Sequence, residues 1–156
     1  MLSIRLATIN DLDELVKLRV IFLDELEPFT SKQIYQETLD KTRDYFTRKI
    51  SSNELQIWIA EDNNKIISTG SLSTIEMPPT SSHFGGGCME GYIFNMYTLA
   101  AYRKRGLATT ILQKMLQYAK DNNYSRVWLM CSDEYAMGVY AKLNFKKRND
   151  VMDYTF

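Results

Sequence analysis

The sequence predicts an α/β (α+β) fold in which a mixed, mostly antiparallel sheet of about six to seven strands is flanked by about four helices. Two strand-like segments around a polar turn indicate an antiparallel hairpin in the first half. In the second half, two helices each follow one strand and precede another, and such crossovers require at least one parallel strand pair. The length of 156 residues suits one domain covering residues 1–156.

The first third of the chain predicts one strand and two helices. Residues 3–8 alternate between apolar and polar types, which is typical of a strand. Asn10 is expected to cap a helix whose apolar residues recur at helical spacing until Pro28 ends it. Ser31 is expected to cap a second helix that runs to about Ile50.

The middle of the chain predicts the hairpin and a central strand. Residues 55–60 and 65–77 are the two hairpin strands, and the polar turn 61–64 joins them. A loop with two prolines and three consecutive glycines follows at 78–87. Residues 91–99, rich in aromatic and β-branched side chains, then form a long strand.

The last third predicts two crossover helices and two further strands. A helix is expected from Gly106 to about Asn122, with small and apolar residues on one face. A buried strand over 126–131, a short helix over 134–143 and a final strand over 150–156 complete the order.

The composition excludes several classes of protein. A formal net charge of zero disfavours a nucleic-acid partner, which usually requires a basic excess. Two cysteines are too few for a disulfide framework, and a single histidine disfavours a metal site. No apolar run reaches the ~18 residues of a membrane span, and no secretory leader is recognisable. We therefore expect a cytoplasmic protein with no metal and no membrane partner.

The segment 98–109 has the features of an anion-binding turn. A strand ends, three basic residues follow, and a helix begins at Gly106. The first amides of a helix have no internal partner and lie at the positive end of its dipole, so they attract phosphate. Gly106 has no Cβ, which allows an anion to approach the backbone. The segment lacks the Walker A and Rossmann patterns, and a solvated basic turn is the alternative interpretation.

Two motifs resemble those of the GNAT (GCN5-related N-acetyltransferase) family. Arg103-x-x-Gly106-x-Ala108 is similar to its R/Q-x-x-G-x-G/A signature, and residues 139–145 resemble its L-Y-E-K-L-G-F ending. Asn144 replaces the usual glycine of that ending. Asparagine is the residue that best tolerates the left-handed conformation after glycine, so the departure is conservative.

The resemblance implies an acyl-CoA N-acyltransferase (GNAT) fold, with acetyl-CoA as cosubstrate. The strand over 126–131 would splay away from the central strand over 91–99. Amides near residues 96–98 would then be left unpaired and could bind the pantetheine arm. Residues 103–109 would bind the pyrophosphate, and Ser132 would contact the cofactor more plausibly than Asp133, whose charge repels phosphate. The expected cofactor-binding residues are Met96, Tyr97, Thr98, Arg103, Lys104, Arg105, Gly106, Leu107, Ala108, Thr109 and Ser132.

Two catalytic residues are expected, Tyr140 from the resemblance and Glu90 from its place at the start of the central strand. Tyr140 matches the tyrosine that protonates the departing thiolate in this family, although its helical apolar neighbours also suit a core tyrosine. Glu90 is the candidate base, because it shares the parity of Tyr92, Phe94 and Met96 along the strand. A water held by backbone carbonyls is an equal alternative.

The implied function is direct transfer of acetyl from acetyl-CoA to a primary amine of a small molecule or peptide. A non-catalytic acyl-CoA sensor is the alternative, and the family resemblance also allows a homodimer. Arg19 interrupts the apolar face of the first helix. It either buries its stem and extends its head to water, or faces the acceptor cleft and holds a carboxylate.

Overall fold

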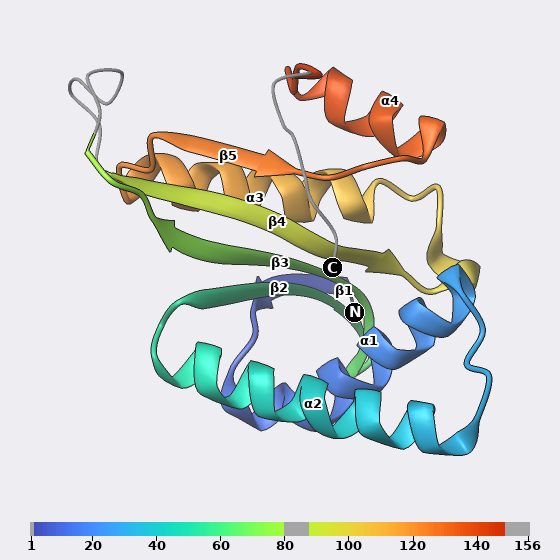
Figure 1. Ribbon diagram of the computed structural model, residues 1–156. Coiled ribbons are helices and arrows are strands. Elements are labelled where there is room, and N and C mark those ends of the chain that lie inside the picture. The colour runs from blue at the N-terminus through green and yellow to red at the C-terminus, as the bar shows by residue number, and fades with distance from the viewer. Residues whose placement is uncertain (1, 80–87, 149–156) are drawn as a thin grey trace.

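The computed structural model describes residues 2–79 and 88–148 and arranges them around one sheet (Figure 1). The sheet has five strands in the order β1-β2-β3-β4-β5, so the prediction of six to seven strands is wrong for the described part of the chain. The final strand expected over 150–156 lies outside the described residues. The elements are β1 Leu2–Leu6, η1 Ile9–Asp11, α1 Leu12–Leu26, α2 Lys32–Ser51, β2 Leu55–Asp62, β3 Lys65–Glu76, β4 Met89–Thr98, η3 Ala100–Tyr102, α3 Leu107–Asp121, β5 Arg126–Leu129 and α4 Glu134–Lys142.

The pairing of the strands confirms the mixed, mostly antiparallel sheet. Strands β1 to β4 pair antiparallel in chain order, and β4 pairs parallel with β5 through the α3 crossover. The predicted hairpin joins β2 and β3 through Asn63 and Asn64, which have φ of 50° and 64°. Two left-handed residues match the twist of a tight hairpin, which is why asparagine suits both positions.

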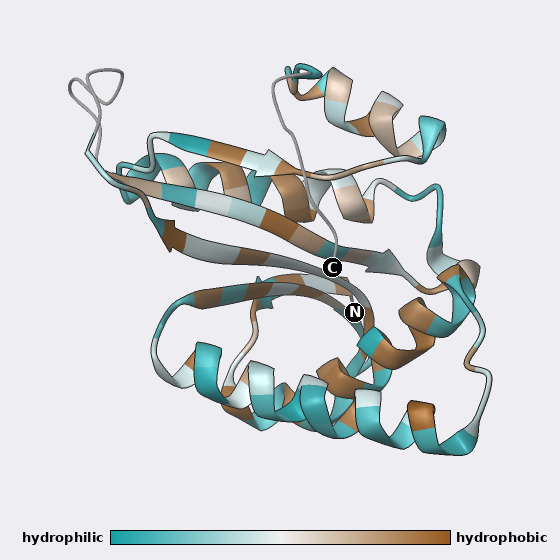
Figure 2. Ribbon diagram, viewed as in Figure 1, coloured by the Kyte–Doolittle hydropathy of each residue, from teal (hydrophilic) through white to brown (hydrophobic). Residues whose placement is uncertain are grey.

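The helices cover both faces of the sheet (Figure 1). Helices α1 and α2 pack on one face around Leu15, Val16 and Phe46, which are all fully buried. Helix α3 packs on the other face through Ile111 and its neighbours, and α4 adds to that cluster beside β5. Apolar positions in Figure 2 lie mainly between the layers, and the outward side of α2 is hydrophilic. Burial of these two apolar clusters is what holds the helices against the sheet.

The first helix begins differently from the prediction, which placed its cap at Asn10. The short η1 intervenes, and α1 begins after Asp11. The Asp11 carboxylate accepts a hydrogen bond from the Thr8 amide at 2.7 Å and pairs with Arg5 of β1 at 2.7 Å. Arg5 also pairs with Glu61 of β2 at 2.6 Å. These contacts between strands and helix, absent from local sequence patterns, determine where the helix starts.

A bulge at Asn95 changes which face of the sheet the following side chains of β4 lie on. Asn95 has φ of 55°, and the pairing with β3 shifts between Thr69 and Ser71. Phe94 therefore packs with the α1/α2 cluster, whereas Met96 packs with the α3 cluster. The expectation that Glu90, Phe94 and Met96 share one face is wrong, because the extra residue of a bulge reverses the alternation beyond it.

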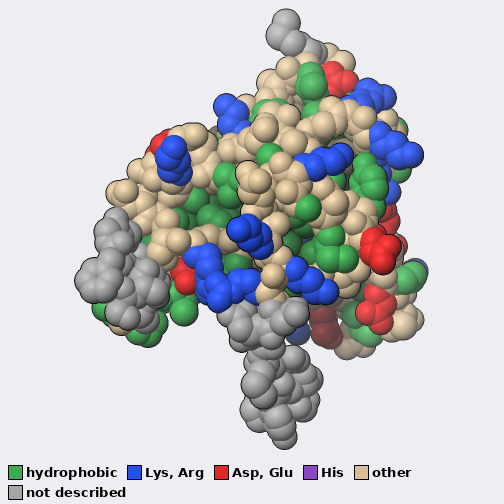
Figure 3. Space-filling view, turned by 90° about the horizontal axis from the view of Figure 1, so that it is seen from above, with side chains coloured by type: hydrophobic (Ala, Val, Ile, Leu, Met, Phe, Trp, Pro, Cys, Tyr) green, Lys and Arg blue, Asp and Glu red, His purple; other side chains and the backbone are tan. Residues whose placement is uncertain are grey.

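Charged side chains show no single dominant patch on the face seen in Figure 3, where Lys and Arg lie in several places with acidic residues among them. Within residues 2–79 and 88–148, no helix is both long and apolar enough to cross a membrane.

Candidate active site

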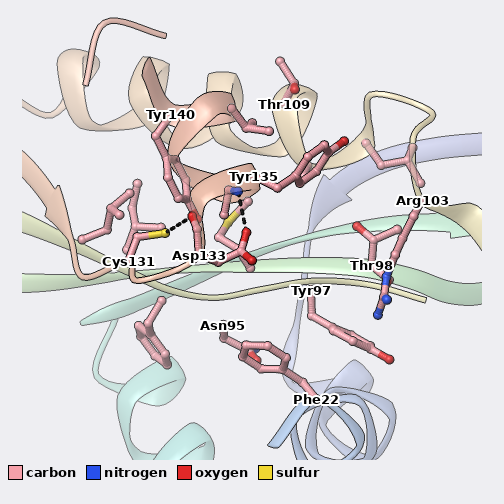
Figure 4. Close-up of a pocket in the computed structure, with 18 of the residues that line it drawn as sticks. Phe22, Asn95, Tyr97, Thr98, Arg103, Thr109, Cys131, Asp133, Tyr135 and Tyr140 are labelled. Carbon is pink, nitrogen blue, oxygen red and sulfur yellow. Dashed lines mark hydrogen bonds between the residues drawn. The ribbon is translucent and has the colours of Figure 1, made fainter. Parts of the chain in front are cut away.

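A cleft of about 790 Å³ opens where β4 and β5 part (Figure 4). The two strands pair only as far as Ile93 and Leu129, whereas β4 continues to Thr98. The edge of β4 beyond Ile93 thus has no strand partner in the described part of the chain. An extended ligand can hydrogen-bond to such an edge as an added strand would. The start of α3, the C-terminal half of α1 and helix α4 form the other walls.

The start of α3 forms an open anion cradle at one end of this cleft. Gly106 precedes the helix in the left-handed conformation, with φ of 78° and ψ of 2°. A Cβ added there would meet nothing within 4 Å, so the space outside this turn is open. No side chain caps the helix, and the amides of Leu107, Ala108 and Thr109 precede the first intrahelical bond. Three uncapped amides at a positive helix end fit a pyrophosphate.

Arg103 is held by helix α1 and by its own strand. Its Nε donates to the Thr98 carbonyl at 2.8 Å, and its Nη2 donates to Glu25 at 2.6 Å. The Tyr97 hydroxyl donates to the same carboxylate at 2.5 Å. Hydrogen bonds from Tyr97 and Arg103 lower the pKa of Glu25, and burial followed by the Glu25 contact raises the pKa of Tyr97 to about 12. The side-chain charge of Arg103 is therefore already partly neutralised, whereas the amides at the start of α3 have no capping side chain.

Most of the expected site residues meet in this cleft, but two do not. Arg105 does not line the cleft. It donates to the Ala101 carbonyl at 3.0 Å, and its guanidinium carbon lies 5.1 Å from the centre of the Tyr102 ring. Glu90 is 4% exposed, pairs with Arg126 at 2.8 Å, and is also outside the lining. The expected residues that do line the cleft are Met96, Tyr97, Thr98, Arg103, Lys104, Gly106, Leu107, Ala108, Thr109, Ser132 and Tyr140.

Tyr140 lines the cleft from helix α4 (Figure 4). Asp133 begins this helix by accepting a hydrogen bond from the Ala136 amide at 2.6 Å, so its carboxylate has a capping role. Burial, with smaller effects of Cys131 and Asp133, raises the pKa of Tyr140 to about 12. The phenol is therefore neutral at physiological pH. No described residue forms a hydrogen bond with its hydroxyl, although its ring packs 5.7 Å from Phe145.

The opposite wall of the cleft carries residues that the sequence did not assign to a site. Figure 4 shows Phe22, Asn95 and Tyr97 on one side of β4, with Tyr135, Tyr140 and Thr109 on the other. Asn95 is 4% exposed, and its amide donates to Thr69 Oγ1 at 3.3 Å and to Ser71 Oγ at 3.4 Å. An asparagine inside an aromatic strand was a usable signal, because it is disfavoured in strands and tolerates positive φ. Nothing local in the sequence marked Glu25.

The described residues contain no group of three or more His, Cys, Asp or Glu side chains arranged to hold a metal ion.

Comparisons with known proteins agree with this architecture. The family model described as acetyltransferase (GNAT) family matches residues 18–145. A crystal structure of a predicted acetyltransferase with acetyl-CoA from Clostridium acetobutylicum is 32% identical, with a TM-score of 0.86 over 99% of this chain and 96% of that one. A GCN5-related N-acetyltransferase from Ralstonia eutropha, 19% identical, has a TM-score of 0.83 over 99% of both chains and so shares the fold.

Curated relatives are more distant. N-acetyltransferase family 8 member 2 of Rattus norvegicus is 24% identical over 144 residues, which are 91% of this chain and 59% of the rat protein. The N-alpha-acetyltransferase of Saccharolobus solfataricus is 24% identical over 154 residues, which are 93% of this chain and 80% of that protein. The chain spans between half and three-fifths of the length of the first rodent relatives that it matches.

Proposed function

Because this chain belongs to the acetyltransferase (GNAT) family, we propose that it transfers an acetyl group from acetyl-CoA to a primary amine of a small molecule or peptide. The observation that carries the proposal is the parting of β4 from β5 directly beside the uncapped start of α3. One cleft thereby offers an unpaired strand edge to an extended amide-containing arm and three helix amides to a diphosphate.

The residues present fit acetyl-CoA. The pyrophosphate would bind the amides of Leu107, Ala108 and Thr109, which the missing Cβ of Gly106 leaves open. The pantetheine arm, which carries two amide groups, would pair with the edge of β4 near Met96. Lys104 lines the same end of the cleft and adds positive charge. The clostridial structure containing acetyl-CoA supports this use of the fold.

In the proposed reaction the amine nitrogen attacks the thioester carbonyl carbon. A C–N bond forms, the C–S bond breaks, the amine loses a proton and the sulfur leaves as a thiolate. A backbone amide of the unpaired β4 edge would polarise the carbonyl oxygen. Holding both reactants in one cleft supplies much of the rate, because their encounter becomes effectively unimolecular.

Tyr140 would stabilise the departing sulfur. A phenol with a pKa of about 12 is a weaker acid than a thiol, whose ordinary pKa is ~8.5, so complete proton transfer to the thiolate runs uphill. We therefore infer that Tyr140 acts as a hydrogen-bond donor while the C–S bond breaks, and that solvent finally protonates the thiolate. The hydroxyl has no hydrogen-bond partner among the residues that the structure describes, so it is available for that bond.

The proton of the attacking amine needs an acceptor within the cleft, since an ordinary amine with a pKa near ~10.4 is mostly protonated at neutral pH. Glu90 does not line the cleft, and its carboxylate is held by Arg126. Of the two alternatives, a water held by backbone carbonyls of the cleft is therefore the base that we propose.

A screen of amines with acetyl-CoA tests this function. Free thiol release would be followed while mass spectrometry identifies products, with protein-free reactions subtracted. Acetylated product from at least one primary amine is the expected result. If acetyl-CoA binds but a broad panel yields no product, the chain is instead an acyl-CoA-binding module.

A further inference from the structure

A half-buried arginine faces the acceptor side of the cleft. Arg19 projects from α1 and lines the cleft with Phe22 and Phe94. Its guanidinium carbon lies 5.4 Å from the centre of the Phe22 ring and 5.9 Å from that of Phe94. Its Nη1 donates a long hydrogen bond, 3.4 Å, to Oδ1 of Asn95. Two aromatic rings and the bulge of β4 thus hold the guanidinium in place.

Among residues 2–79 and 88–148, no carboxylate forms an ion pair with this cation. A guanidinium has five N–H donors, and in the described part of the chain only the Asn95 contact uses one. The other acidic groups at the cleft are already engaged: Glu25 binds Arg103 and Tyr97, and Asp133 caps α4. Burial lowers the pKa of Arg19, which is the sign of a charge that has lost water without gaining a carboxylate.

We propose that Arg19 binds a carboxylate of the acceptor, so that the preferred substrates are amines that carry a carboxylate a few bonds away, as free amino acids do. This inference rests on the proposed acetyl transfer. Arg19 touches Asn95, and the unpaired edge of β4 begins beside that residue, where the thioester would lie. An acceptor held by Arg19 therefore has its amine close to the reacting carbonyl.

The chemistry of the wall favours a carboxylate over other groups. The planar guanidinium can donate two parallel hydrogen bonds to the two oxygens of a carboxylate. Phe22, Tyr92 and Phe94 surround this position with aromatic surface, which suits an apolar side chain on the acceptor. The Oδ1 of Asn95 accepts a hydrogen bond from the Arg19 guanidinium and so orients the remaining N–H groups of Arg19.

The test compares the common L-amino acids that carry a primary amine with their carboxamides in wild-type protein and in R19Q and R19K. The ratio of kcat/KM for each acid to kcat/KM for its amide measures how much the carboxylate contributes to substrate preference. We expect wild type to favour the best acid by about tenfold or more, R19Q to reduce that ratio to near one, and R19K to retain part of it. Lys17→Gln removes the same charge from an exposed position of the same helix and should keep the wild-type ratio.

A binding measurement separates this inference from the proposed function. Thermal stabilisation of the CoA-saturated protein by an amino acid, absent with its amide and absent in R19Q, supports the carboxylate site even if no product forms, in which case only the acetyl transfer fails. If amides are acetylated as well as acids, or if R19Q keeps the wild-type preference, the carboxylate site is refuted while the acetyl transfer stands.

Discussion

Substitution of Gly106 by alanine probes the proposed pyrophosphate cradle. The residue has φ of 78°, and an added Cβ would meet no atom within 4 Å. The cost to the folded protein is therefore the left-handed backbone alone, about 1 kcal/mol, which corresponds to a fall in Tm of roughly 2–4 °C. The added methyl group would also project into the space that the anion needs.

The expected loss of CoA affinity is larger than this loss of stability. One charge-assisted hydrogen bond contributes ~1.5–3 kcal/mol, so the Kd for CoA should rise roughly 10- to 150-fold in G106A. Calorimetry with CoA measures the Kd, and urea denaturation measures the free energy of unfolding. Asn123→Ala is the matched control, because Asn123 is also left-handed, with φ of 57°, at the far end of α3. N123A should lose comparable stability and bind CoA normally. A wild-type Kd in G106A would refute the cradle.

Three further outcomes test other parts of the account. Tyr140→Phe should lower kcat about tenfold or more while the Kd for acetyl-CoA stays within about twofold, as steady-state rates and calorimetry can show. The Arg5 contact lowers the pKa of Asp11 to about 2, so its contribution to stability is present above the ordinary carboxyl pKa and is lost as pH falls through about 2. Wild type should therefore lose more unfolding free energy than Asp11→Asn between pH 4 and 2 in urea titrations; parallel curves would contradict this pairing. Gly70→Ala would place a Cβ 2.7 Å from Ile111 Cγ2 and should destabilise the fold by ~1–3 kcal/mol, whereas Gly138→Ala, with open space around its Cβ, should not.

Local patterns predicted much of the fold. The hairpin, the α3 crossover, the short helix α4 and the helix start at Gly106 each depend on residues adjacent in sequence, and all appear where expected. Asn144 has φ of 66°, which agrees with its expected left-handed conformation. The open, uncapped start of α3 was predictable for the same reason, because a turn and the first amides of a helix are one continuous segment.

Features that depend on tertiary packing were not predicted. The bulge at Asn95 results from the pairing of β4 with β3, and it reversed the face on which Met96 was expected. Arg103 lines the cleft, but its contact with Glu25 at the end of α1, 78 residues away, follows from no local pattern. Glu90 was chosen by parity alone, and its partner Arg126 comes from the neighbouring parallel strand.

The most direct test of the central claim is a calorimetric titration of acetyl-CoA into the purified protein, repeated with free adenosine 3′,5′-bisphosphate, which lacks both the pyrophosphate and the pantetheine arm. We expect saturable binding of acetyl-CoA to one site per chain, with a large loss of affinity for the truncated ligand. If acetyl-CoA produces neither heat nor thermal stabilisation, or if the truncated ligand binds as tightly, then the cleft between β4, β5 and the start of α3 does not bind the cofactor as proposed.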